Sequence, residues 1–303
     1  MIKKIAVLLA AYNGEKWISE QLKSITDQIS VDITVFISCD LSTDNTIKII
    51  RELNNEKIKL LPYGEKFGAA APNFYRLIKD VDFAGFDYVA FSDQDDIWLD
   101  DKLFSGIEKL QRENADAYSS NVIAFWANGK KKEIVKATPQ KRYDYLFEGP
   151  GPGCSFIVTT EFAEEFKNYI QEKDRWNKLK DLDWHDWLIY AYARKNGYKW
   201  VIDSNSHMLY RQHSDNQLGA NSGFKQLKKR VKDVLSGYGI SQSLKTVDFL
   251  NMRNDAFVSK WWVNNKVRYF KLAKYSRLCR RRKKDVFLFF CSCILMAVKR
   301  GNK

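Results

Sequence analysis

Proline and glycine are scarce in this chain, with five prolines and 15 glycines among 303 residues. That scarcity argues against a collagen-like chain, a low-complexity disordered chain and a β-sandwich with many turns. Long apolar runs are also missing. The nearest approach to one, residues 286–298, has thirteen residues, whereas a helix that crosses a bilayer needs about 18 or more. A composition of 45% hydrophobic and 29% charged residues is that of a folded globular protein.

The five cysteines form no obvious framework. They are odd in number and lack the paired CxxC spacing of a zinc site or the pattern of a small secreted domain, so we expect a reducing compartment. Two lysines precede an apolar run at the N-terminus, as in a secretory signal, but the run at residues 5–11 has only seven residues. We expect a buried first strand there.

Charge is unevenly distributed. Residues 224–303 hold 21 basic and four acidic residues, a net +17, so the preceding residues carry −4 of the total of +13. We therefore expect two domains, the first at 1–223 and the second a helical region at 224–303 that is basic and rich in aromatic residues.

The basic residues of this second region lie beside aromatic and apolar residues, which is typical of a helix at the surface of an anionic membrane. A nucleic-acid partner is not expected, because no binding module is visible. A solvated basic helix without a partner remains the alternative. The residues that carry the prediction are Lys225, Lys228, Lys229, Arg230, Lys232, Trp261, Trp262 and the cluster at 280–284.

Short apolar runs alternate with helix-like segments in the first hundred residues. This alternation predicts an α/β fold with a mostly parallel sheet covered by helices on both faces. The expected strands are at 5–11, 33–38, 58–61, 88–92, 154–159, 200–203 and 207–213, and the expected helices are at 15–28, 43–53, 73–81, 102–114 and 183–196.

Polar residues follow three of these strands. Ligands bind beyond the carboxyl ends of parallel strands, so we expect Tyr12, Asp40 and the acidic segment at 93–96 to converge. Asp93 and Asp95 are spaced as a pair that binds Mg²⁺ or Mn²⁺, which prefer oxygen ligands, although a solvated acidic turn has the same spacing. The ring of Tyr12 offers a face on which a nucleobase stacks, or it simply packs.

Further candidates lie on later loops. Gly68 permits a close approach of the backbone to a ligand, and Lys66 is within reach of a phosphate. The planar fork of Arg211 matches diphosphate oxygens, and His213 is a candidate ligand of the metal or diphosphate.

Asp186 lies near the start of a predicted helix, where the helix dipole favours the ionised carboxylate that a general base needs. The alternative is that Asp186 only stabilises the helix terminus. Trp184 and Trp187 flank it, and either line the site of an acceptor sugar or pack in the core.

Together these motifs resemble the family-2 glycosyltransferases of the GT-A fold, and within them the bacterial rhamnosyltransferases of O-antigen and polysaccharide assembly. The resemblance covers roughly residues 1–215. The motifs that carry it, in order, are those at 10–14, 40–44, 68–74, 92–98, 153–156, 185–187 and 210–213.

The resemblance implies a role for each matching residue. It implies that Ala10, Tyr12 and Asp40 hold the nucleoside, that Asp93 lies near the ribose and sugar, and that Asp95 binds a Mn²⁺ or Mg²⁺ ion bridging the diphosphate. Asn73 falls in the donor-binding motif that begins at Gly68, and Asp186 matches the catalytic base of an inverting displacement. One departure is Cys39, which stands where the family commonly has an aspartate.

We therefore expect an inverting, metal-dependent glycosyltransferase. It would move a sugar, with L-rhamnose from dTDP-L-rhamnose as the first choice, to a lipid-linked saccharide at the cytoplasmic face of a bacterial inner membrane, as a peripheral protein. One alternative is a nucleotidyltransferase, for which residues 11–14 lack the expected basic, glycine-rich loop. Another is a saccharide-binding protein without turnover, for which the loss of Asp95 or Asp186 would be expected.

Overall fold

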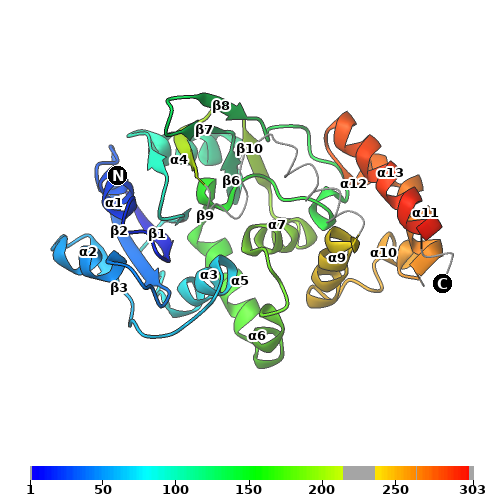
Figure 1. Cartoon of the computed structure of the whole chain (residues 1–303), viewed down its shortest axis with the longest axis horizontal. Helices are drawn as coiled ribbons and strands as arrows, with labels where there is room; N and C mark the ends of the chain where they lie inside the picture. The colour runs from blue at the N-terminus through cyan, green and yellow to red at the C-terminus, as the bar shows by residue number, and fades with distance from the viewer. Residues whose placement is uncertain (1, 214–235, 264, 300–303) are drawn as a thin grey trace. The chain divides into compact units, whose positions relative to one another are not determined.

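The computed structural model describes residues 2–213, 236–263 and 265–299. It divides into two compact units, one formed by Met1–Ala137 with Pro150–Ala220 and the other by Thr138–Gly149 with Asn221–Lys303 (Figure 1). The domain boundary that we expect near residue 223 and the basic residues Lys225, Lys228, Lys229, Arg230 and Lys232 lie outside the described residues. Residues 138–149, which the sequence places in the first domain, belong to the second unit.

A seven-stranded sheet forms the centre of the first unit, in the order β10-β6-β9-β4-β1-β2-β3. All neighbouring strands are parallel except β9, which runs antiparallel to both β4 and β6. The mostly parallel sheet is therefore confirmed. Its strands are β1 (Lys3–Ala11), β2 (Val31–Cys39), β3 (Ile58–Leu60), β4 (Tyr88–Ser92), β6 (Ala117–Ser120), β9 (Ile157–Thr159) and β10 (Trp200–Asp203).

The central strand β1 explains why both faces of the sheet must be covered. Side chains alternate along a strand, and those of Val7 and Leu9 join the core beneath α1 and α4, whereas Leu8, also buried, lies on the opposite face of β1. Helix α3 packs on β1 and β2. The helices of the unit are α1 (Ile18–Thr26), α2 (Thr46–Glu52), α3 (Ala70–Asp80), α4 (Lys102–Glu113), α5 (Thr160–Gln171), α6 (Lys173–Leu179) and α7 (His185–Lys195), with a 3₁₀ turn at Gly153–Ser155.

A second sheet of four strands has the order β5-β11-β7-β8. It consists of β5 (Ile97–Trp98), β7 (Val122–Trp126), β8 (Lys131–Ile134) and β11 (Met208–Gln212). The sequence predicts strand β11 but not this sheet. Its pairing of Leu209 with Ile97 matters for the site, because it brings the residues after β11 next to the acidic segment before β5.

The second unit is helical. It contains α9 (Tyr238–Phe249), α10 (Val258–Trp261), α11 (Asn265–Lys274), α12 (Ser276–Cys279) and α13 (Lys283–Lys299), together with a 3₁₀ turn at Asp144–Leu146. Helix α13 packs along α11. No helix in the described ranges has both the length and the apolar character required to cross a bilayer.

A buried ion pair ties residues 138–149 to the helices of the second unit. Nη1 of Arg281 lies 3.4 Å from Oδ2 of Asp144, and these side chains are 2% and 0% exposed. Arg281 also donates from its backbone N–H to Glu148 at 2.6 Å and from Nη2 to the carbonyl of Gly149 at 2.7 Å. This one arginine therefore fixes the segment at several points.

Arg281→Met should destabilise the second unit by about 3–5 kcal/mol, because it leaves the buried Asp144 without this counter-charge. Urea unfolding measures the effect. The matched control is Arg282→Met, which removes an exposed arginine next in the sequence and should change stability little. Equal unfolding midpoints for the two variants would contradict the role of the buried pair.

Candidate active site

The loops that follow β1, β2 and β4 meet at the carboxyl edge of the sheet, as the sequence predicts. The side chain of Gln94 accepts a hydrogen bond from the backbone N–H of Tyr12 and donates one to its carbonyl, both at 2.6 Å. The hydroxyl of Ser42 accepts the N–H of Asn13 at 3.1 Å. A Cβ on Gly14 would lie 2.4 Å from Oε1 of Gln94, so a larger residue there would displace the side chain that holds Tyr12.

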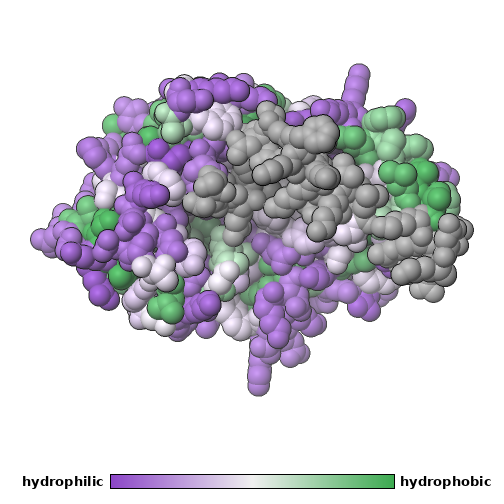
Figure 2. Space-filling model, in the orientation of Figure 1, coloured by the Kyte–Doolittle hydropathy of each residue, from purple (hydrophilic) through white to green (hydrophobic). Residues whose placement is uncertain are grey.

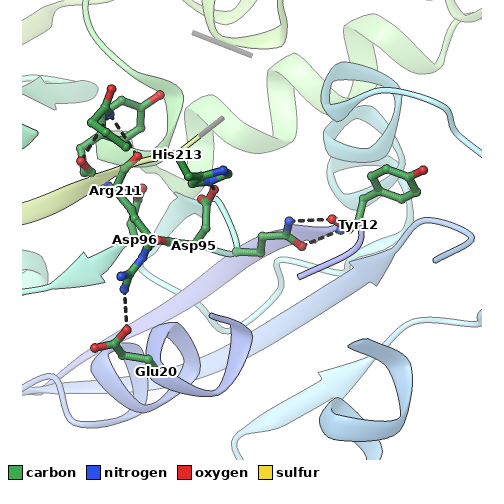
Figure 3. Close-up of polar contacts among 9 residues, drawn as sticks. Tyr12, Glu20, Asp95, Asp96, Arg211 and His213 are labelled. Carbon is green, nitrogen blue, oxygen red and sulfur yellow. Dashed lines mark hydrogen bonds and ion pairs between the residues drawn. The ribbon is translucent and has the colours of Figure 1, made fainter. Parts of the chain in front are cut away.

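The ring of Tyr12 is exposed while its backbone is held. The residue is 52% exposed, and Figure 3 shows its ring directed away from Asp95 and His213. Ala10, at the end of β1, is 8% exposed. This arrangement favours a stacking role for Tyr12 over the packing alternative, since a core tyrosine would be covered.

Asp40 organises the loop that follows β3. Its buried carboxylate accepts the N–H groups of Phe67 at 2.8 Å and of Gly68 at 2.7 Å. Gly68 has φ +76°, a left-handed conformation that favours glycine. Asn73 donates to the carbonyl of Ser38 at the end of β2. Lys66 is exposed on the same loop.

Asp95 and His213, both predicted metal ligands, lie 118 positions apart in the sequence and contact each other. Nε2 of His213 lies 2.7 Å from Oδ2 of Asp95 (Figure 3). The imidazole also stacks on Trp17, with ring centroids 4.2 Å apart. A carboxylate oxygen and an imidazole nitrogen that converge in this way fit a divalent cation.

Acidic side chains are concentrated around this pair. Burial and the neighbouring Asp95 and Asp186 raise the pKa of Asp93 to about 7. Burial, Asp95 and Asp93 likewise raise the pKa of Asp96, whose side chain is fully buried. Carboxylates held this close repel one another, and a bound cation relieves that repulsion.

A buried lysine lies near the acidic segment, and no sequence pattern singles it out. Lys102 is 2% exposed, and its Nζ lies 3.4 Å from the centroid of the Trp98 ring. Burial lowers the pKa of Lys102 to about 7, so at neutral pH it is only partly charged. It therefore compensates the aspartates incompletely.

A second group of potential ligand atoms exists in the described part of the chain. One ligand atom each from Asp93, Asp96 and Cys154 lie within 4.8 Å of one another. Burial raises the pKa of the Cys154 thiol well above its ordinary value, and a protonated thiol is a poor ligand for a hard cation. Asp95 with His213 is the better set.

Asp186 lies in the first turn of α7, where its carboxylate accepts the N–H of Trp187 at 2.7 Å. Burial raises its pKa to about 6, although Trp187 and the positive charge of Lys136 act in the opposite direction. Burial therefore outweighs the helix terminus in setting this pKa. A carboxylate with this pKa is ionised at neutral pH and still basic enough to accept a proton.

The surroundings of Asp186 are tightly packed. His185 stacks on Phe74 with ring centroids 4.0 Å apart. A Cβ on Gly153 would lie 2.8 Å from Nε2 of His185, so the glycine allows the 3₁₀ turn at Gly153–Ser155 to approach the His185 ring. Trp184 and Trp187, the predicted acceptor residues, are both half-buried on either side of Asp186.

Arg211 lies in the site, but its guanidinium contacts protein groups. Nε donates to the backbone carbonyl of Asp95 at 2.7 Å, and Nη2 pairs with Glu20 of α1 (Figure 3). Sequence reasoning missed Trp17 and Glu20. Their spacing of three within a predicted helix was the available signal, because it places both on one face.

Comparisons with known proteins identify the family of this chain. The family model "Glycosyl transferase family 2" matches residues 6–162. The chain is 44% identical over 290 residues to the dTDP-rhamnosyl transferase RfbG of Shigella flexneri, covering 95% of this chain and 99% of that protein. It is also 29% identical over 155 residues to the UDP-Glc:alpha-D-GlcNAc-diphosphoundecaprenol beta-1,3-glucosyltransferase WfgD of Escherichia coli, covering 51% of this chain and 59% of that one.

Solved structures share the fold. The TarS 1–349 structure from S. aureus in complex with UDP matches with a TM-score of 0.55 at 17% identity, covering 99% of this chain and 92% of that one. The mannosyltransferase PcManGT of Pyrobaculum calidifontis, in complex with GDP-Man and Mn²⁺, matches with a TM-score of 0.53 at 14% identity, covering 99% and 88%. At these identities the likeness concerns the fold alone.

The pKa of Asp186 predicts how turnover depends on pH. If Asp186 is the base, kcat/KM should fall below about pH 6, where the carboxylate becomes protonated. Lys136→Gln removes a charge that lowers this pKa, so the fall should begin at higher pH. The control Lys132→Gln removes an exposed lysine of β8 and should leave the profile in place. A profile that Lys136→Gln does not move would argue against Asp186.

Proposed function

The chain belongs to glycosyl transferase family 2 and has the GT-A fold, and from that premise we propose that it transfers L-rhamnose from dTDP-L-rhamnose to a saccharide acceptor. The observation that carries the proposal is the meeting of Asp95 and His213 at the sheet edge where Tyr12 is exposed. The similarity to a dTDP-rhamnosyl transferase along nearly the whole chain supports this donor.

The donor would lie across the loops at the carboxyl edge. The thymine base stacks on Tyr12 near Ala10, and the loop that Asp40 holds, with Gly68 and Lys66, borders the nucleotide. Asp93 lies near the ribose and sugar. Asp95 and His213 would hold the Mn²⁺ or Mg²⁺ ion, which supplies positive charge to the departing diphosphate.

Asp186 would act on the acceptor. Its carboxylate takes the proton of the acceptor hydroxyl as that oxygen forms a bond to the anomeric carbon. The bond from that carbon to the phosphate oxygen breaks, and dTDP leaves with the electron pair. A single displacement inverts the configuration. Trp184 and Trp187, on either side of Asp186, would border the acceptor sugar.

A donor screen tests the proposal directly. dTDP-L-rhamnose, UDP-glucose, UDP-galactose and GDP-mannose are each incubated with Mn²⁺, and the released nucleoside diphosphate is measured. We expect dTDP-L-rhamnose to be consumed fastest.

Asp186→Asn should lower transfer by about 10²–10⁴-fold while donor affinity is retained, because an amide keeps the shape but cannot accept the proton. Preference for a UDP-sugar, or donor affinity lost together with transfer, would contradict the assignments.

We propose that the acceptor is lipid-linked. The enzyme would reach it as a peripheral protein bound to the anionic surface of the membrane at its cytoplasmic face. A relative whose name specifies a diphosphoundecaprenol acceptor supports this choice. Exposed apolar side chains lie on α13 beside the exposed basic residues at 282–284, and Figure 2 shows hydrophobic surface over this helix. The exposed apolar residues of α11 and α13 are Val267, Phe270, Phe287, Leu288, Phe290, Leu295 and Val298.

The double variant Phe287→Ser/Leu288→Ser should weaken binding to vesicles of anionic phospholipid, measured by cosedimentation. The two residues are 65% and 50% exposed, so the unit should stay folded. High salt should weaken the binding of the wild type only in part, because the apolar component is not screened. The control Ile29→Ser/Leu53→Ser removes exposed apolar residues of the first unit and should bind normally. Equal binding of the wild type to neutral and anionic vesicles would contradict the proposed surface.

A further inference from the structure

Two residues at the end of β11 face the same helix. Side chains two apart in an extended segment lie on one side, and here Arg211 and His213 both contact the α1 region whereas the intervening Gln212 is 5% exposed. The residues that receive them are Glu20 and Trp17. Trp17 is the N-cap residue of α1, and Glu20 lies in its first turn.

Arg211 holds the acidic segment through both its main chain and its side chain. Its backbone N–H donates to Oδ1 of Asp96 at 3.1 Å, and Nε donates to the carbonyl of Asp95 at 2.7 Å. Nη2 pairs with Glu20. The guanidinium carbon lies 4.6 Å from the centroid of the Phe125 ring in β7. These contacts connect α1, β7 and β11 to the segment that carries Asp95.

We propose that Arg211 is a positioning residue: with Glu20 and Trp17 it holds His213 against Asp95 in the arrangement that binds the divalent cation, instead of binding the donor diphosphate. The inference rests on the proposed metal site. The sequence predicts that the guanidinium of Arg211 reaches the diphosphate. In the structure it is directed instead to Glu20 and to the backbone carbonyl of Asp95 (Figure 3).

The chemistry of arginine explains why this residue type stands here. A guanidinium donates in fixed, planar directions, so one side chain reaches a carbonyl with Nε and a carboxylate with Nη2 at the same time. A lysine offers a single point charge and cannot span both. Groups that orient metal ligands typically change metal affinity by about 10–100-fold when removed.

The experiment measures Mn²⁺ affinity from the electron paramagnetic resonance signal of free Mn²⁺, with dTDP present. Glu20→Ala and Arg211→Lys should each weaken Mn²⁺ binding by about 10–100-fold. The double variant should lose no more Mn²⁺ affinity than the single variant with the larger loss, because both changes disrupt the same contact between Glu20 and Arg211. The matched control Lys23→Ala removes another exposed charge of α1, one that pairs with Asp27, and should bind as the wild type does.

The affinity for dTDP without metal separates this role from a phosphate contact. We expect it to be unchanged in Glu20→Ala and Arg211→Lys. If Arg211 instead binds the diphosphate, Arg211→Lys should weaken dTDP binding. Glu20→Ala should then leave dTDP binding unchanged or strengthen it, because the guanidinium is released, and the Mn²⁺ affinity of both variants should stay normal. That result would overturn the inference.

Failure of the metal site itself gives a different result. A wild-type protein that does not bind Mn²⁺, or that binds it equally well after Asp95→Asn, contradicts the proposed site and the inference together. Glu20 is exposed, so its variant should keep the wild-type unfolding temperature. If Glu20→Ala lowers the unfolding temperature as well as the Mn²⁺ affinity, while Lys23→Ala lowers neither, the Glu20 contact is merely structural. That result would overturn the inference.

Discussion

Repulsion among the three carboxylates at the end of β4 is the constraint on which the site depends. Asp93, Asp95 and Asp96 follow a fully buried strand, and burial with mutual repulsion raises the pKa values of Asp93 and Asp96. Lys102 is too poorly solvated to compensate them fully. Neighbouring donors therefore hold the segment, and the proposed divalent cation would offset the remaining charge.

The scaffold that holds these carboxylates comes from both sheets. The parallel sheet brings the loops after β1, β2 and β4 to one edge, where Gln94 and Asp40 fix the loops around them. The smaller sheet adds Arg211 and His213 from a strand more than a hundred residues later. The proposed base, Asp186, lies on a separate element, α7, and burial raises its pKa. Binding of the donor and removal of the acceptor proton are thus assigned to different elements.

Much of this was predictable from the sequence, for definite reasons. The apolar run at 5–11 forms the central strand β1, and parallel pairing with β2 and β4 then places their ends together. The two-residue strand β5 is too short to leave a periodic signal, so the smaller sheet was missed. The partner of Arg211 is Glu20, 191 positions away, which spacing cannot reveal. Nor does spacing report the burial that raises the pKa of Asp186, or the packing of residues 138–149 within the second unit.

The central claim is that a nucleotide-sugar donor binds at the carboxyl edge with its cation between Asp95 and His213. The most direct test is a crystal structure with dTDP and Mn²⁺, in which anomalous scattering locates the manganese. We expect one manganese ion bound by Asp95 and His213, with the thymine base stacked on Tyr12. Manganese bound by Asp93, Asp96 and Cys154, or dTDP away from this edge, would contradict it.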